Sequence, residues 1–181
     1  SPSDLACLTG GIDRPLAAGA VLPIEVSSAI PGSTGLDLEL EAVDPSIVKV
    51  SGNELTAMAP GRSALLAVAD DDLAVDLTHI WVMEPTRISI HRTDAAAGAI
   101  VTGPVELLVG DELNLDLVAY ANGTRLTGRL AGQWSTSSDA LSVLRDGSIS
   151  SRRLVARTAG TSEVAVVWGQ HHSSITVEVQ P

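Results

Sequence analysis

The feature that most constrains this chain is an internal repeat. Residues 17–82 and residues 108–179 carry the same features in the same order. In the earlier stretch Gly19 precedes a run of alternating aliphatic residues, and in the later stretch Gly110 does the same. Self-similarity of this kind indicates one structural unit written twice, and each copy has the length of a small β-sandwich.

The later parts of the two copies also match. The run from Asp44 to Asn53 aligns with the run from Ser138 to Gly147, and each leads into a strand-like segment. Gly61, in an Ala-Pro-Gly turn, then aligns with Gly160, in an Ala-Gly-Thr turn. The spacing between matched positions drifts by a few residues, as insertions in loops produce.

The boundary between the copies is expected near Pro85. Val82 closes the last apolar run of the first copy, and Ile88 opens the next one. Because proline lacks an amide hydrogen, it breaks strand pairing between them. We therefore predict two domains, residues 1–84 and residues 85–181, joined by a very short linker.

The runs between turns are short and alternate between aliphatic and polar residues, as in Leu113 to Leu117 before the turn Asn122-Gly123. This period of two is typical of strands, and no helical period persists beyond about two turns. With no Phe, three Trp and one Tyr, the core must be built from Val, Leu, Ile and Ala. The sequence predicts an all-β chain of two tandem β-sandwich domains, and the family resemblance described next makes them immunoglobulin-like. The Ala- and Gly-rich segment 93–103 is expected to be a mobile loop.

The order of these motifs resembles one known family. The second copy carries it best, through Val109-Gly110-Asp111, Trp134-Ser135-Thr136-Ser137-Ser138-Asp139, Gly147 and Ala159-Gly160-Thr161. It resembles the bacterial immunoglobulin-like domain of the group 2 type. The first copy departs from the pattern, with Leu40-Glu41-Ala42 in place of Trp-Ser and Pro60-Gly61-Arg62 in place of Ala-Gly-Thr. The resemblance implies a secreted or surface-displayed sandwich that serves as adhesin segment, stalk or accessory module, without a shared active site.

Charge excludes some classes of partner. The chain has 22 Asp plus Glu against 11 Lys plus Arg, giving a formal net charge of -11. Such a surface repels phosphate backbones, so no nucleic acid partner is expected. No run approaches the roughly 18 apolar residues of a membrane helix, so no membrane insertion is expected. The lone Cys7 cannot form an intramolecular disulfide, and packing must supply the stability.

Metal binding has one main candidate. Asp70, Asp71 and Asp72 form an acidic run in the last hairpin of the first copy. Clustered carboxylates on a loop can hold calcium if carbonyl oxygens complete the shell. The ordinary alternative is a charged, solvated turn that discourages edge pairing. His171 and His172 are weak zinc candidates, because neighbours on a strand point to opposite faces.

Trp81 and His79 are the candidate ligand-binding residues. Trp81 has opposite strand parity to Ile80 and Val82, which places it outside the core or at the domain junction together with His79. Trp134 and Trp168 are expected in the core instead. An exposed ring of this kind can stack on a sugar, although a single ring is weak support for a carbohydrate module.

No catalytic constellation emerges. The chain lacks a Gly-x-Ser-x-Gly motif, and the four histidines are expected at unrelated surface positions. We therefore expect a non-catalytic module of a bacterial secreted or cell-surface protein, extracellular, surface-attached or periplasmic, with no cofactor apart from a calcium ion at Asp70 to Asp72. It would act as a spacer or an adhesion and protein-interaction segment. The alternatives are a polysaccharide-binding accessory of a secreted enzyme and, less simply, an enzyme in its own right.

Overall fold

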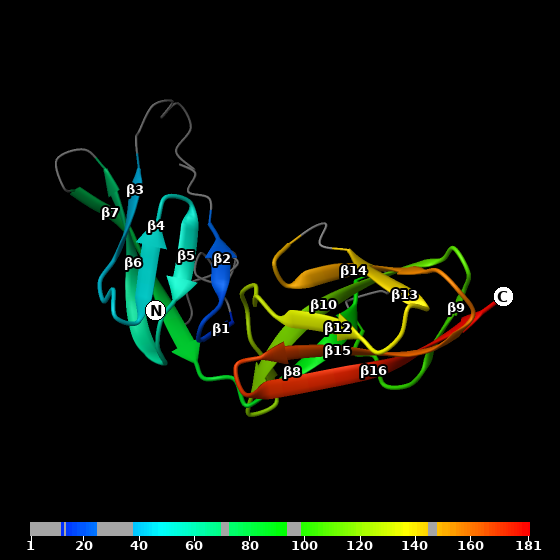
Figure 1. The fold of residues 1–181 in the computed structure, drawn as a ribbon. Coiled ribbons are helices and arrows are strands. Elements are labelled where there is room, and N and C mark those ends of the chain that lie inside the picture. Colours follow the sequence, from blue (N-terminus) through cyan, green and yellow to red (C-terminus); the bar gives the residue numbers. More distant parts are fainter. Residues whose placement is uncertain (1–11, 13, 25–37, 70–72, 94–98, 145–147) are drawn as a thin grey trace. The chain divides into compact units, whose positions relative to one another are not determined.

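All the regular secondary structure of the described residues is β-strand. In the computed structural model the described residues are 12, 14–24, 38–69, 73–93, 99–144 and 148–181. None of these residues lies in a helix, and their strands form four sheets (Figure 1). The expected all-β class is confirmed. The chain divides into two compact units, one of Ser1–Glu84 with Leu126–Gly128, the other of Pro85–Arg125 with Arg129–Pro181.

The described residues of the first unit form seven strands in two sheets. Four of them lie in the order β1-β7-β6-β3, and three in the order β2-β5-β4. Their bounds are β1 Leu16–Ala17, β2 Val21–Pro23, β3 Glu39–Ala42, β4 Val48–Ser51, β5 Glu54–Ala57, β6 Gly61–Ala69 and β7 Leu73–Met83.

In the second unit, nine strands are found outside the undescribed residues 94–98 and 145–147, again in two sheets. One has the order β12-β15-β16-β9, and the other has the order β11-β10-β14-β13 with β8 also paired to β10. Their bounds are β8 Arg87–Arg92, β9 Val105–Leu108, β10 Glu112–Ala121, β11 Thr124–Arg125, β12 Gln133–Thr136, β13 Leu141–Leu144, β14 Ser151–Ala156, β15 Gly160–Trp168 and β16 His171–Gln180.

The strand order is that of an immunoglobulin-like sandwich. Constant-type domains place strands A, B, E and D in one sheet and C, F and G in the other. The second unit follows this arrangement with β8, β10, β14 and β13 in one sheet and β12, β15 and β16 in the other. The first unit repeats it with β2, β5 and β4 facing β3, β6 and β7. The two tandem immunoglobulin-like sandwiches expected from the sequence are therefore present.

The repeat extends to individual backbone hydrogen bonds. Gly19 N–H donates to Ala57 O at 2.7 Å, and Gly110 N–H donates to Ala156 O at 2.9 Å. Each acceptor residue donates back across the same pair of strands, Ala57 to Ala20 O and Ala156 to Asp111 O, both at 2.9 Å. Gly19 and Gly110 both have left-handed backbone angles, with φ of 81° and 97°. A residue with a Cβ is disfavoured in that region, which explains the repeated glycine.

In each unit a strand near the start runs parallel to the last strand. Leu16 and Ala17 of β1 pair with Val82 and Met83 of β7. In the second unit β9, which follows β8, pairs with β16 over four residues, from Val105 with Val177 to Leu108 with Gln180. This pairing joins an early strand of each sandwich to its last strand.

Aliphatic side chains fill both cores. The core of the first unit is made by Leu16, Ala18, Val48, Leu55, Ala57, Leu65, Ile80 and Val82. In the second unit the most deeply buried large side chains include Ile90, Leu113, Leu115, Leu117, Leu130, Leu154 and Val164. Leu55 and Leu154 occupy matched positions, because each pairs with a leucine of the neighbouring strand, Leu22 and Leu113 respectively.

Two details differ from the sequence-based expectations. Part of the segment 93–103 is not a free loop, since Arg92 N–H bonds to Ala99 O and Val101 N–H bonds to Ile90 O. Residues 94–98 of that segment lie outside the described residues. Strands β4 and β13 align one residue away from the expected match. Val48 pairs with Ala57 and Leu141 pairs with Ala156, so Val48 matches Leu141, whereas the aligned sequences match Ile47 with Leu141. When two aliphatic runs differ in length by one turn residue, the sequence alone gives no sign of such a shift.

Candidate ligand-binding surface

Trp81 and His79 lie on the solvent-facing side of the first unit. They belong to β7, where Ile80 and Val82 alternate with them and are almost completely buried. Because successive side chains of a strand point to opposite faces, Trp81 and His79 must point outward together. Trp81 remains 48% exposed, and His79 is also exposed. The outward orientation follows the parity argument, and binding by these residues stays a prediction.

Arg62 is the direct neighbour of Trp81 across the β6–β7 pair. Its Cζ lies 5.2 Å from the centroid of the indole ring. A guanidinium at this distance over an aromatic face is attracted by the ring quadrupole. The pair therefore presents a cation and a large apolar ring side by side on the exposed surface of β6 and β7.

Further side chains continue this surface along the sheet. Leu66 pairs with Leu77, which is 46% exposed, and Ala64 pairs with His79. On the other side of β6, Glu41 pairs with Leu66 and Glu39 pairs with Val68. We refer to this surface as the outer face, and it comprises Glu39, Glu41, Arg62, Ala64, Leu66, Val68, Leu77, His79 and Trp81.

The matched positions of the second unit have a different chemistry. Thr161 pairs with Glu178 where the first unit has Arg62 and Trp81. Glu163 with Thr176 and Ala165 with Ser174 occupy the next two rows, and Ser135 and Gln133 complete the surface on β12. At the same register the face of the second unit therefore has polar residues where the first unit has Trp81, His79 and Leu77, and the exposed Val167 stands at the position of Val68.

Arg62 was missed by the sequence analysis. A symmetric hairpin places residues at equal distances from its centre opposite each other. Counting outward from Asp71, the middle of the acidic run, places Arg62 opposite Ile80, one residue away from Trp81. The register of β6 and β7 shifts by one residue between Ala67 and Val68, and this shift brings Arg62 opposite Trp81.

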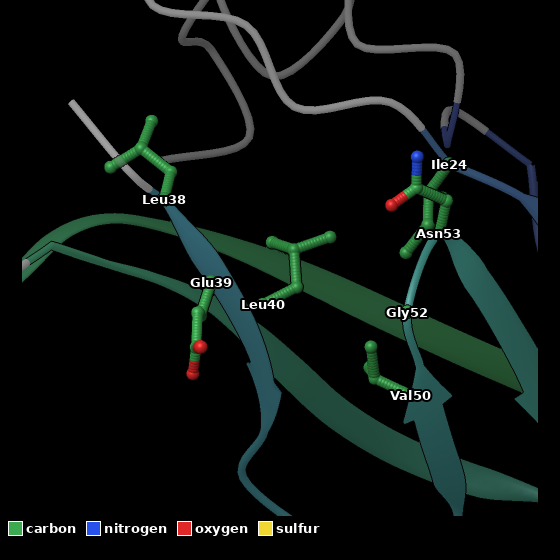
Figure 2. Close-up of a pocket in the computed structure, with 7 residues that line it drawn as sticks. All are labelled: Ile24, Leu38, Glu39, Leu40, Val50, Gly52 and Asn53. Carbon is green, nitrogen blue, oxygen red and sulfur yellow. The ribbon is translucent and has the colours of Figure 1, made fainter. Parts of the chain in front are cut away.

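Figure 2 shows a second feature of the first unit, a hollow of about 560 Å³. Leu40 of β3 and Val50 of β4 line it together with Gly52 and Asn53 of the β4–β5 turn. Ile24, Leu38 and Glu39 complete the lining. Ile24 and Leu38 are the last described residues on either side of 25–37, and we assign no ligand to this hollow.

The calcium candidates Asp70, Asp71 and Asp72 lie outside the described residues. Asp76, which follows them on β7, accepts a hydrogen bond from the backbone N–H of Leu77 at 2.7 Å. Within the described part of the chain, no group of three or more His, Cys, Asp or Glu side chains is placed to hold a metal ion. Over the same residues no helix is long and apolar enough to cross a membrane.

One histidine contradicts the expectation that all four are surface residues. His91 of β8 is only 3% exposed, and its Nε2 lies 2.9 Å from the hydroxyl oxygen of Tyr120. Arg87, opposite Tyr120 on β8, places its guanidinium 4.5 Å from the centroid of the Tyr120 ring. Pairing of β8 with β10 buries His91 and Tyr120, whereas Arg87 stays exposed. The short alternating run Ile88 to Ile90 gave no indication of that partner strand.

The other aromatic residues have mixed positions. Trp134 is half-buried, and its buried Nε1 has no hydrogen-bond partner among the described residues. Trp168 lies at the end of β15, half-buried, and stacks on His171 with ring centroids 6.1 Å apart. The expected core position therefore holds only in part for both tryptophans. His172 is exposed opposite Val167, on the other face from His171.

Asp44 of the first unit is held by hydrogen bonds to two serines, Ser46 and Ser63. Its Oδ1 accepts hydrogen bonds from the Ser46 hydroxyl at 2.6 Å and from the Ser46 backbone N–H at 3.0 Å. These bonds, led by the one from the hydroxyl, lower the pKa of the Asp44 carboxyl below its ordinary value. Asp44 N–H in turn donates to Ser63 Oγ at 3.0 Å, which ties this turn to β6.

Comparison with known proteins gives structural likeness without sequence likeness. No family model matches the chain, and no curated protein matches it. Domains 4 and 5 of the S-layer protein SbsC align over 84% of this chain and 75% of theirs, at 13% identity and a TM-score of 0.38. Invasin, described as a bacterial integrin-binding protein, aligns over 81% of this chain and 33% of its own, at 11% identity and a TM-score of 0.42.

A third similar structure is an enzyme. The endo-fucoidan hydrolase MfFcnA9 of glycoside hydrolase family 107 aligns over 93% of this chain and 32% of its own, at 14% identity and a TM-score of 0.35. The chain thus spans about a third of the length of invasin and of this hydrolase. Because these likenesses are distant, the fold assignment rests on the strand order and register of the chain itself.

Proposed function

We propose that this chain is a non-catalytic tandem immunoglobulin-like module of a bacterial secreted or cell-surface protein, with domains at 1–84 and 85–181. In this proposal it serves as a spacer that also offers an adhesion or protein-interaction surface, and its two domains are of the bacterial group 2 type. Its location would be extracellular, on the cell surface or periplasmic.

The observation that carries the spacer role is the parallel pairing of an early strand with the last strand in each unit, β1 with β7 and β9 with β16. A force applied at the two ends of such a pair acts along the strands, so several hydrogen bonds must break together instead of one after another. Unit 2 has four paired positions between β9 and β16, whereas unit 1 has two between β1 and β7. Both units are therefore built to resist stretching, the second more than the first.

Stretching single molecules tests this role. Pulling from the two ends of the chain should give two unfolding events, with the first unit yielding at the lower force. A matched control in a Cys7→Ser background attaches one handle at Val109→Cys and the other after Pro181. That geometry loads a single end of the β9–β16 pair, because Val109 N–H bonds to Gln180 O. Its unfolding force should be clearly lower, and equal forces in the two geometries would refute the mechanical role.

A second candidate function is polysaccharide binding. The specific observation in its favour is the exposed pair Trp81 and His79 on one face of β7. A screen against a polysaccharide panel should then reveal saturable binding that Trp81→Ala abolishes. Binding that survives Trp81→Ala, or none at all, removes this candidate, and hydrolysis that persists through further purification would contradict both functions.

Calcium binding at Asp70 to Asp72 also stays a proposal. Millimolar calcium should raise the melting temperature of the first unit, because a ligand that binds only the folded state stabilises it. The double variant Asp71→Asn, Asp72→Asn should lose that shift. A melting temperature unaffected by calcium in the parent chain would retire the site.

A further inference from the structure

We propose that the outer face of the first unit is a contact surface for a second copy of this chain. The proposal goes beyond the spacer role and does not depend on it. It starts from the contrast between the units, since the second unit keeps the same strands and register but places Thr161, Glu178 and other polar residues at the matched positions. Exposed apolar side chains also occur elsewhere, such as Val43 and Ile149, but Leu77 and Trp81 share one face with Arg62, and grouped apolar side chains of this kind mark interaction surfaces.

The charges on the outer face are arranged at opposite ends. Glu39 and Glu41 lie on β3 at the edge of the sheet, and Arg62 lies two rows further along β6 beside Trp81. Leu66, Leu77 and Ala64 lie between these ends. A face with acid at one end, base at the other and apolar residues between them is complementary to itself.

A twofold axis uses this complementarity. In an isologous dimer each contact occurs twice, so Arg62 of one copy meets Glu41 of the other and the reverse. With ordinary strand spacing, the twofold axis that exchanges Arg62 and Glu41 runs mostly across the strands. It places Leu66 and Leu77 of one copy against His79 and Trp81 of the other. The strands of the two sheets then cross at about 40°, close to the aligned class of sheet packing.

The size of the face predicts a weak dimer. Three strands about 4.8 Å apart and four rows about 6.7 Å apart give a face of roughly 15 by 25 Å per copy when the widths of the side chains are included. The total buried area would be about 800 Å², which is below the size of most stable interfaces and fits a weak, transient dimer. The net charge of -11 opposes association at long range, but salt screens it beyond about 8 Å at physiological strength, whereas Arg62 and Glu41 would act in contact.

A second copy explains the face better than a sugar does. The guanidinium of Arg62 already lies over the indole ring of Trp81, which reduces the ring area free for stacking. Trp and Arg are instead among the residues most enriched at the centre of protein interfaces. A protein surface with matching charges is thus the chemistry that the face fits.

Sedimentation of the full chain over about 1 to 500 µM tests the proposal. We expect a reversible monomer–dimer equilibrium at physiological salt. Leu77→Asp and Arg62→Glu should each weaken the dimer about tenfold or more, and the double variant Arg62→Glu, Glu41→Arg should restore it to within about threefold of the parent. The control Val167→Asp, on the exposed part of β15 in the second unit, should leave the dimer unchanged.

Melting curves establish that each variant is folded, and the charge reversals provide a readout if Leu77→Asp is unstable. A monomer at every concentration would overturn the proposal and leave the outer face to another protein or to a polysaccharide. A dimer that is not weakened by Leu77→Asp and Arg62→Glu would overturn the proposal as well. So would a dimer that Val167→Asp breaks. A double variant whose dimer stays as weak as that of Arg62→Glu alone is the third contradicting result.

Discussion

The two units share a backbone frame and differ in what they present to solvent. Gly19 and Gly110 make the same hydrogen bond to Ala57 and Ala156, yet the paired residues Arg62 and Trp81 are replaced by Thr161 and Glu178. Core and turn residues are held to one pattern because they determine the strand pairing, whereas outward residues are free to vary. The two units therefore differ most in the outward side chains of β6 with β7 and of β15 with β16.

The largest expected effect comes from truncating a matched pair of core leucines. Leu55 and Leu154 are both fully buried, in β5 and β14. Leu55→Ala should lower the free energy of unfolding of the first unit by about 2 to 5 kcal/mol, and Leu154→Ala should do the same to the second. Calorimetry should show one transition moved and the other in place for each variant. A change that moves both transitions equally would mean that the units are not separate folding units.

The glycines at the start of β6 and β15 should differ in their tolerance. Gly61 and Gly160 have φ of 156° and 151°, where a side chain is strained. A Cβ on Gly61 would lie 2.7 Å from Ile47 Cδ1, whereas one on Gly160 would lie 3.8 Å from Ala140 Cβ. We expect Gly61→Ala to cost about 2 to 4 kcal/mol and Gly160→Ala about 1 to 3 kcal/mol, measured by urea unfolding. The reverse order would contradict the packing difference.

A matched pair of serines should respond in different ways. Ser63 Oγ accepts a hydrogen bond from Asp44 N–H, whereas Ser162 Oγ is buried without a partner among the described residues. Ser63→Ala should cost about 1 kcal/mol or more, because it leaves that backbone N–H without its acceptor. Ser162→Ala should be neutral or stabilising, since it removes an unpaired buried hydroxyl. Equal losses in denaturant melts would show that the two hydroxyls are equivalent after all.

The smallest expected effect is a pH dependence confined to the first unit. The folded-state pKa of Asp44 is lowered by its bonds to Ser46, so this carboxylate stabilises the fold above its unfolded-state pKa. That contribution is lost as the pH falls through the folded-state pKa. Asp44→Asn should therefore flatten the acid side of the melting profile of the first unit and leave that of the second unit unchanged. An unaltered acid profile would remove the role assigned to Asp44.

Much of the fold could be predicted because the repeat and the period of two are local signals. Gly19 and Gly110 mark a turn that only glycine adopts easily, and alternation assigned Trp81 to the outside. The contact of Arg62 with Trp81 depends on the register of a hairpin, and the burial of His91 depends on which strand pairs with β8. Neither is written in the residues themselves, because register and partner choice are decided by the packing of the whole sheet. Binding by Trp81 and His79 and calcium at Asp70 to Asp72 stay predictions.

Amide hydrogen exchange followed residue by residue by NMR tests the shared frame most directly. If one hydrogen-bonded frame is used twice, the amides of Gly19 and Ala57 should be protected, and so should those of Gly110 and Ala156. Each pair should also lose its protection together with the core of its own unit in Leu55→Ala or Leu154→Ala. Rapid exchange at Gly19 and Ala57 while Gly110 and Ala156 stay protected would contradict the duplication.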